Sequence, residues 1–132
     1  PAVVREFAAI WRDTDKIVYS SSLAEVSTAR TTLEPRFEPE AVRRLTQASR
    51  ADLSIGGAEI AAEAFGHGLV DECVLLLCPV VLGGGKPALP RGARLDLELL
   101  DHRRFDNGAV LLRYAVRNQR GPRSTLRGAP AT

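Results

Sequence analysis

The stretch Ser54-Ile55-Gly56-Gly57-Ala58-Glu59-Ile60 determines how this chain is expected to fold. It joins the short segment Asp52 to Ile55, which is expected as a strand, to a helical stripe from Ala58 to Phe65 that Gly66 and Gly68 close. A helix that starts at the carboxyl end of a strand points unpaired N–H groups at the crevice above the sheet, and two glycines let a phosphate approach them. The stretch therefore predicts a pyrophosphate cradle. A tight strand-to-helix connection would use the same residues, and neither GxGxxG nor a Walker lysine is present.

The residues before this stretch predict two helices and two strands. Apolar residues return at helical spacing from Ala2 to Trp11, and Pro39 to Ala48 has the pattern of an amphipathic helix with proline in its first turn. Lys16 to Tyr19 is a β-branched run that enters the polar loop Ser20-Ser21-Ser22, and Thr28 to Leu33 is expected as another short strand.

The residues after it predict three more strands. Val70 to Leu82 is a long apolar run that Pro79 interrupts, which indicates a bend, a bulge or an edge there. Leu95 to Leu100 alternates apolar and acidic residues, and Val110 to Val116 is expected as its hairpin partner. The predicted class is therefore α/β, with one domain over residues 1–116.

Composition limits the possible classes of protein. With 132 residues, 45% of them hydrophobic and 26% charged, the chain is expected to be globular rather than disordered. It has no apolar run long enough for a membrane helix, and because it opens at Pro1 without any methionine we expect it to be a piece of a longer protein.

The net charge of +2 arises in residues 117–132, a stretch with four arginines and no acid that is predicted to be a disordered tail. Without aromatic residues, that tail is not expected to bind nucleic acid.

The cysteines and histidines predict neither a disulfide nor a metal site. Cys73 and Cys78 lie five residues apart in one expected strand, about 16 Å from each other, and cannot bridge. Free thiols fit a reducing cytoplasm. His67 and His102 are isolated, so no metal is expected.

The serine triplet is a second candidate for a binding site. Hydroxyl and N–H groups just beyond the end of the Lys16–Tyr19 strand could hold a phosphate or a ribose, whereas the plainer interpretation is a polar turn. The triplet and the Gly56-Gly57 pair both follow expected strands, so they could lie at one edge of a parallel sheet.

Several motifs together resemble one known family. They are Tyr19-Ser20-Ser21, Ile55-Gly56-Gly57-Ala58-Glu59-Ile60, Gly68-Leu69-Val70-Asp71-Glu72, Pro79-Val80-Val81-Leu82-Gly83-Gly84-Gly85-Lys86-Pro87 and Arg104-Phe105. Over Lys16 to Val116 the chain resembles the C-terminal reductase domain of the bacterial riboflavin-biosynthesis bifunctional deaminase-reductase. That domain has the dihydrofolate reductase-like fold, so the resemblance implies a mostly parallel sheet with antiparallel C-terminal strands and flanking helices, here truncated at the N-terminus.

The resemblance implies NADPH as the cofactor. Tyr19, Ser20 and Ser21 would line its adenosine and 2′-phosphate end, and Ile55, Gly56, Gly57, Ala58, Glu59 and Ile60 would enclose its pyrophosphate. Glu59 is expected to serve through its backbone rather than its carboxylate. The Gly83 to Pro87 loop is expected to border the pocket or a subunit interface.

The implied activity is hydride transfer to a ribosylaminopyrimidine or pteridine-like substrate, as in 5-amino-6-(5-phosphoribosylamino)uracil reductase. The substrate-facing part of such a domain precedes the segment present here, so no residue of this chain can be named as catalytic. A homodimer is expected, since the Val70 to Leu82 run is unusually apolar for an exposed edge. Two alternatives stay open: a catalytically silent nucleotide-binding or assembly module, and a true dihydrofolate reductase.

Overall fold

The computed structural model describes residues 1–117, so all of the expected basic tail except Arg117 lies outside the described residues. The class is α/β, as predicted, with parallel strands in one sheet and antiparallel strands in another. Contacts along the chain divide it into two compact units. The first contains residues 1–69 and 86–91, and the second contains residues 70–85 and the described residues from Gly92 onward.

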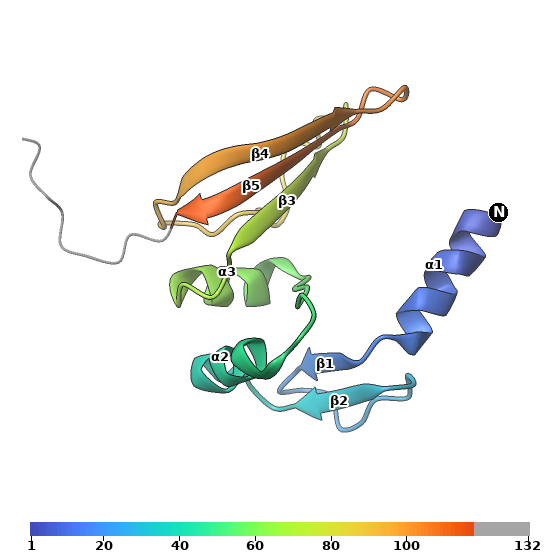
Figure 1. Ribbon diagram of the computed structural model, residues 1–132, viewed down its shortest axis with the longest axis vertical. Coiled ribbons are helices and arrows are strands. Elements are labelled where there is room, and N and C mark those ends of the chain that lie inside the picture. The colour runs from blue at the N-terminus through green and yellow to red at the C-terminus, as the bar shows by residue number, and fades with distance from the viewer. Residues whose placement is uncertain (118–132) are drawn as a thin grey trace, which may run out of the picture. The chain divides into compact units, whose positions relative to one another are not determined.

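The first unit contains three helices and a pair of strands. Its elements are α1 (Ala2–Asp13), β1 (Lys16–Tyr19), β2 (Thr31–Glu34), α2 (Pro39–Ala48) and α3 (Ala58–Gly66). β1 and β2 are parallel, with Lys16 opposite Thr31 and Tyr19 opposite Glu34, so their carboxyl ends meet at one edge (Figure 1). The predicted bounds of β1 and α2 are confirmed, and α1 is two residues longer than the apolar spacing indicates.

One hydrogen bond links α2 to the residue after α3, and another closes the turn that ends α3. The guanidinium of Arg43, on α2, donates a hydrogen bond of 3.4 Å to the carbonyl of His67, directly after α3. Beyond α3 the chain turns at Gly68, whose φ is +63°, and the N–H of Leu69 returns to the carbonyl of Ala64 at 2.9 Å. Helices commonly end at a glycine in the left-handed region, which explains why Gly66 and Gly68 in the sequence predicted the end of α3.

The strand expected at Asp52–Ile55 does not form. Residues 51–56 lie in an irregular segment that leads into α3. A strand requires a neighbour that accepts and donates its ladder hydrogen bonds, and among residues 1–117 no ladder includes this segment. Two alternating apolar residues, Leu53 and Ile55, were therefore not sufficient evidence for a strand.

The second unit is an antiparallel sheet. Its strands are β3 (Glu72–Leu77), β4 (Asp96–Arg104) and β5 (Val110–Arg117), in the order β3-β5-β4. The predicted β4–β5 hairpin is confirmed. Of the strand-like run expected from Val70 to Leu82, only Glu72–Leu77 forms β3, and residues 78–82 on both sides of Pro79 lie outside the sheet because proline cannot donate to a ladder. β4 continues four residues beyond its predicted end because a bulge between Leu99 and Asp101 shifts the register and lets the polar second half keep its pairing with β5.

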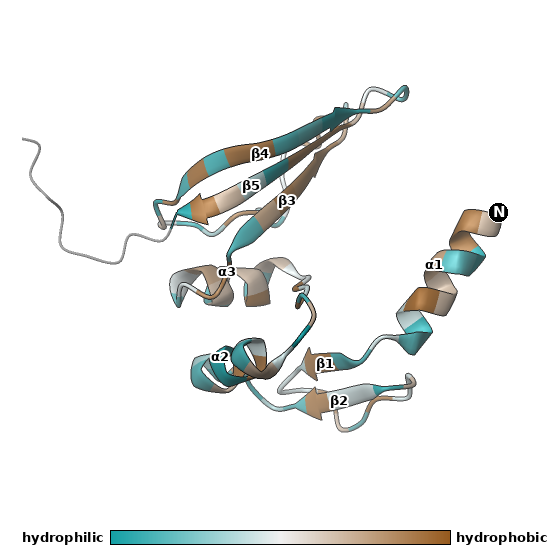
Figure 2. Ribbon diagram, in the orientation of Figure 1, coloured by the Kyte–Doolittle hydropathy of each residue, from teal (hydrophilic) through white to brown (hydrophobic). Residues whose placement is uncertain are grey.

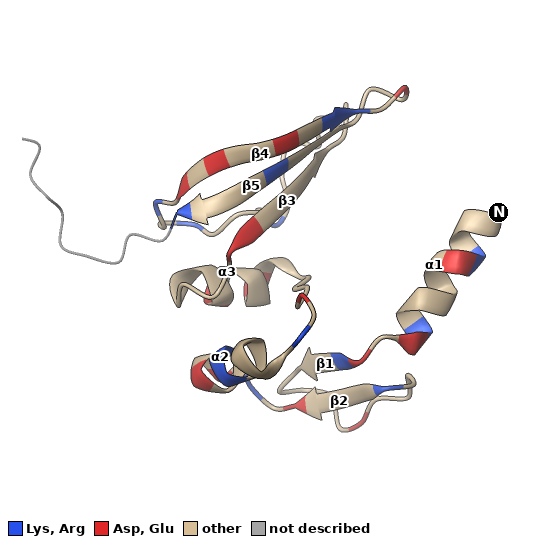
Figure 3. Ribbon diagram, in the orientation of Figure 1, with Lys and Arg blue, Asp and Glu red and all other residues tan. Residues whose placement is uncertain are grey.

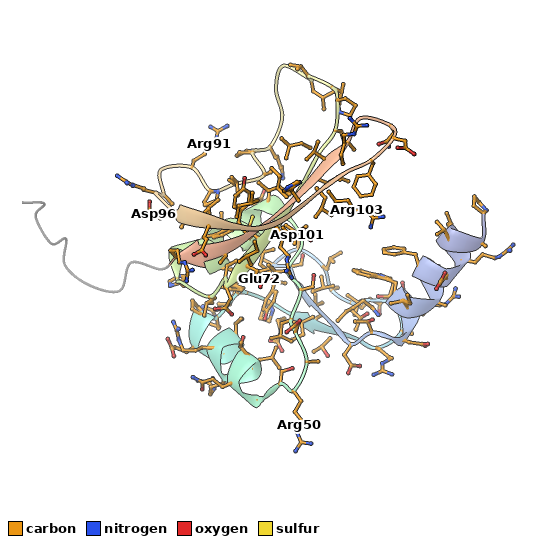
Figure 4. The ribbon with its side chains drawn as sticks, turned by 45° about the horizontal axis from the view of Figure 1, so that its top comes forward. Arg50, Glu72, Arg91, Asp96, Asp101 and Arg103 are labelled. Carbon is orange, nitrogen blue, oxygen red and sulfur yellow. The ribbon has the colours of Figure 1, made fainter. Side chains whose placement is uncertain are left out.

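The strand register places Cys73 and Tyr114 on one face, called the apolar face, and Glu72, Asp101 and Arg113 on the other, called the charged face. Figures 2 and 3 show how apolar and charged residues are distributed along the three strands. Cys73 lies opposite Tyr114 on the apolar face and is buried, and burial raises the pKa of its thiol. Cys78 follows β3 and is exposed; both thiols are free. On the charged face, Arg113 of β5 lies directly opposite Asp101 of β4, and its guanidinium is 3.6 Å from the carboxylate of Glu72 on β3. Asp101 and Glu72 are labelled in Figure 4.

No helix within residues 1–117 is both long and apolar enough to cross a membrane.

Candidate functional site

Tyr19 ends β1 at the carboxyl edge of the parallel pair. Its ring packs edge-on against Phe37, with 5.3 Å between the ring centroids, and it lies opposite Glu34 on β2. Partial burial, and to a smaller extent the charge of Glu34, raise the pKa of Tyr19. The phenol is therefore neutral at physiological pH, and the Phe37 contact fixes the aromatic ring at this edge.

The serines that follow form a compact turn. The backbone N–H of Ser20 donates to the carbonyl of Glu34 at 3.0 Å, which extends the β1–β2 ladder by one bond. The Oγ of Ser20 accepts hydrogen bonds from the N–H groups of Ser22 and Leu23 at 3.3 and 3.2 Å. This is the polar turn that the plainer interpretation of the triplet predicted. Ser21 at the tip is exposed.

The first turn of α3 has the geometry expected of an anion cradle. Gly57 caps the helix with φ +102° and ψ 124°, a conformation that L-residues with side chains rarely adopt, and no side chain caps the N-terminus. Its carbonyl accepts the first intrahelical bond, from Ala61 at 2.9 Å. The N–H groups of Ala58, Glu59 and Ile60 have no acceptor within the helix.

The space beside Gly56, the residue before the helix cap, is open. A Cβ built on Gly56 would have no heavy atom within 4 Å, whereas one built on Gly57 would lie 3.4 Å from Cγ2 of Ile60. A phosphate could therefore reach the N–H groups past Gly56. The residues predicted to enclose a pyrophosphate fit such a group.

The sequence analysis missed one ion pair at this cradle. The ammonium of Lys86 lies 2.5 Å from Oε1 of Glu59 in the first turn of α3, and both side chains are exposed. The hydrogen bond to Lys86, and then its charge, lower the pKa of Glu59, and the same contact raises the pKa of Lys86. The only signal in the sequence was the Gly83–Pro87 loop, which was expected to border the pocket or an interface. The Glu59 carboxylate, which was not expected to take part in the site, forms an ion pair with a lysine.

The two predicted groups of site residues belong to the same unit, but each is built separately. Tyr19 to Ser21 close the β1–β2 edge, and Ile55 to Ile60 open α3. Among the described residues, no hydrogen bond or ring contact joins the two groups. No three His, Cys, Asp or Glu side chains within residues 1–117 gather as metal ligands would.

A comparison with known protein families shows the family to which the chain belongs. The model of the RibD C-terminal domain matches residues 4–111, which include every candidate site residue. The chain belongs to the RibD C-terminal domain family. This confirms the resemblance inferred from the serine, glycine-pair and glycine-loop motifs.

Two other proteins are similar to this member of the RibD C-terminal domain family. The "Uncharacterized protein YyaP" of Bacillus subtilis (strain 168) is 29% identical over 116 residues, which are 86% of this chain and 61% of that protein. The chain thus spans less than two thirds of the length of this curated relative. A solved structure described as "Putative riboflavin biosynthesis protein" from Shewanella sp. PV-4 aligns with a TM-score of 0.67 at 18% identity, over 89% of this chain and 71% of that one. At that identity the likeness establishes the fold.

Proposed function

We propose that this chain is the cofactor-binding part of an NADPH-dependent reductase that acts on a ribosylaminopyrimidine or pteridine-like substrate. The observation that supports the proposal is the uncapped start of α3, open past Gly56, in a chain of the RibD C-terminal domain family. A helix start of this kind attracts a pyrophosphate through its N–H groups and its positive dipole end.

Each group of residues has a separate task in this proposal. The N–H groups of Ala58, Glu59 and Ile60 hold the pyrophosphate, and Gly56 leaves room for it. Tyr19, with the exposed Ser21 beyond the turn, borders the adenosine and 2′-phosphate end. When bound, the nicotinamide supplies the hydride, and the protein contributes position and electrostatics.

Titration of the purified protein with NADPH tests the proposal. NADPH fluorescence and the unfolding temperature are measured at increasing cofactor concentration. Bound cofactor stabilises the folded state by about 2.7 kcal/mol at a hundredfold excess over Kd, so a clear rise in the unfolding temperature is expected. If NADPH caused no change in fluorescence and no stabilisation, the proposal would be contradicted. Oxidation of NADPH with a pyrimidine substrate, compared with dihydrofolate, then identifies the substrate class.

Association between copies is a second part of the proposal. β3 is an edge strand of its sheet, and its residues Val74, Leu76 and Leu77 are exposed. An apolar edge strand is a template for pairing with another chain, and a second copy would cover it symmetrically. We therefore propose a homodimer formed along β3. The same surface favours the alternative of a silent assembly module, which steady NADPH turnover would exclude.

A further inference from the structure

The first turn of α3 has no cation of its own. Its residues are Ala58, Glu59, Ile60 and Ala61, so the only charged side chain there is acidic. The positive charge at this position comes from Lys86, 27 residues further along the chain. Although the preceding residues Val70–Gly85 belong to the second unit, the segment Lys86–Arg91 belongs to the first unit, together with α3.

We infer that Lys86 binds the pyrophosphate of the dinucleotide cofactor at the start of α3, and that Glu59 is the residue that positions it. This inference rests on the proposed function, which assigns a pyrophosphate to that helix end. An ammonium group has three donors, so Lys86 can keep one bond to Glu59 and direct the others at phosphate oxygens.

The energetics of the ion pair agree with such a role. Both side chains are largely exposed, at 76% for Lys86 and 83% for Glu59, and exposed pairs contribute little to folding. The pair is therefore not needed for stability and can rearrange when an anion arrives. Because the carboxylate keeps the ammonium beside the helix end, Lys86 loses less side-chain freedom on binding than an unrestrained lysine would.

The site predicts which part of the cofactor Lys86 contacts. The N-terminus of α3 is the proposed position of the pyrophosphate, whereas the 2′-phosphate is assigned to the end near Tyr19 and Ser21. NADPH and NADH share the pyrophosphate and differ at the 2′-position. Loss of Lys86 should therefore weaken both by the same factor.

The test compares dissociation constants of NADPH and NADH for the purified protein and its variants, measured by fluorescence or calorimetry. Lys86→Ala is expected to weaken both cofactors about tenfold, which corresponds to about 1.4 kcal/mol. Lys86→Arg should recover most of this loss because it retains the charge. Arg91→Ala is the matched control, since it removes another exposed cation from the same segment, and it should change either constant by less than about twofold. Unfolding temperatures without cofactor verify that each variant folds.

A double-mutant cycle tests the role of Glu59. In the wild-type background, Lys86→Ala removes a contact and also leaves a carboxylate unpaired beside the phosphates. In the Glu59→Gln background it removes only the contact, so the loss of affinity should be smaller. Additive effects would refute the positioning role of Glu59.

The outcomes separate this inference from the proposed function. If the wild-type protein binds NADPH and Lys86→Ala binds it equally well, the Lys86 inference is wrong and the proposed function stands. A loss for NADPH alone would overturn the pyrophosphate assignment in favour of the 2′-phosphate. If the wild-type protein binds neither cofactor, both the inference and the proposed function fail.

Discussion

Gly56 and Gly57 are neighbours, but their backbone conformations differ in whether they can accept a side chain. Gly57 adopts φ +102°, which is strained for any residue with a Cβ, whereas Gly56 has no positive φ and open space around it. Gly57→Ala should therefore lower the free energy of unfolding by about 1 to 3 kcal/mol. Gly56→Ala should leave the free energy of unfolding unchanged or raise it by up to about 1 kcal/mol. It should also weaken the binding of NADPH, because its methyl group would occupy the proposed path of the phosphate. Denaturant unfolding and cofactor titration of both variants test this. Equal stability losses would show that the two backbone positions are equivalent.

Tyr19 makes stability depend on pH in the alkaline range. Its pKa in the folded protein is raised above 10.0, chiefly by burial, so the folded state holds the phenol proton more tightly than the unfolded chain does. The resulting stability is complete below pH 10 and is lost as pH rises through the folded-state pKa. The free energy of unfolding of the wild-type protein should therefore fall more steeply above pH 10 than that of Tyr19→Phe. The buried Cys73 thiol also titrates in this range, but both proteins contain it, so it cancels in the comparison. Parallel pH profiles would contradict the assignment.

At the level of elements, local patterns predicted most of the structure. The helical spacing of α2 and α3, the β-branched run of β1 and the alternation before the β4–β5 hairpin are properties of neighbouring residues, and all four features formed. The strand at Asp52–Ile55 did not form, because a strand also needs a partner that no local pattern specifies. The same limit applies to the site: the glycine pair marked the cradle, but the Lys86–Glu59 contact joins residues 27 positions apart.

The antiparallel sheet offers a test of its charged face. Arg113 on the central strand β5 lies opposite Asp101 on β4 and opposite Val74 on β3, and its guanidinium reaches diagonally to the carboxylate of Glu72, 3.6 Å away. Arg113→Glu would place a carboxylate directly opposite Asp101 and diagonal to Glu72, and the free energy of unfolding should fall by about 1 kcal/mol. The reversed pair Glu72→Arg with Arg113→Glu should regain part of that loss. The midpoints of urea unfolding measure both effects, and equal midpoints for the single and double variants would show that the pairing adds nothing.

Among the described residues, few apolar side chains are buried and many are exposed. Within residues 1–117 only Ala64, Val70, Cys73, Ala109 and Val116 form the buried core, while eighteen large apolar side chains are exposed. They lie on several elements, including α1, where Phe7 and Trp11 stack in the open with ring centroids 6.2 Å apart. Monomeric proteins rarely expose so much apolar surface, so the described residues are expected to gain stability from a covering partner.

The proposed dimer along β3 can be tested at the two edges of one sheet. Leu76 on β3 is 59% exposed, and Leu100, at the bulge of β4 on the opposite edge, is 41% exposed. A lysine on an edge strand opposes pairing with another chain, and at an exposed position it should change the stability of the monomer by no more than about 0.5 kcal/mol. Leu76→Lys should therefore convert the dimer to a monomer in size-exclusion chromatography with light scattering, while the matched control Leu100→Lys stays dimeric. If the wild-type protein is monomeric at all concentrations, or if Leu100→Lys dissociates the dimer and Leu76→Lys does not, β3 is not the interface. Because neither substitution changes a residue of the proposed cradle, the NADPH affinity of the Leu76→Lys monomer would also show whether the cradle functions within a single copy of the chain.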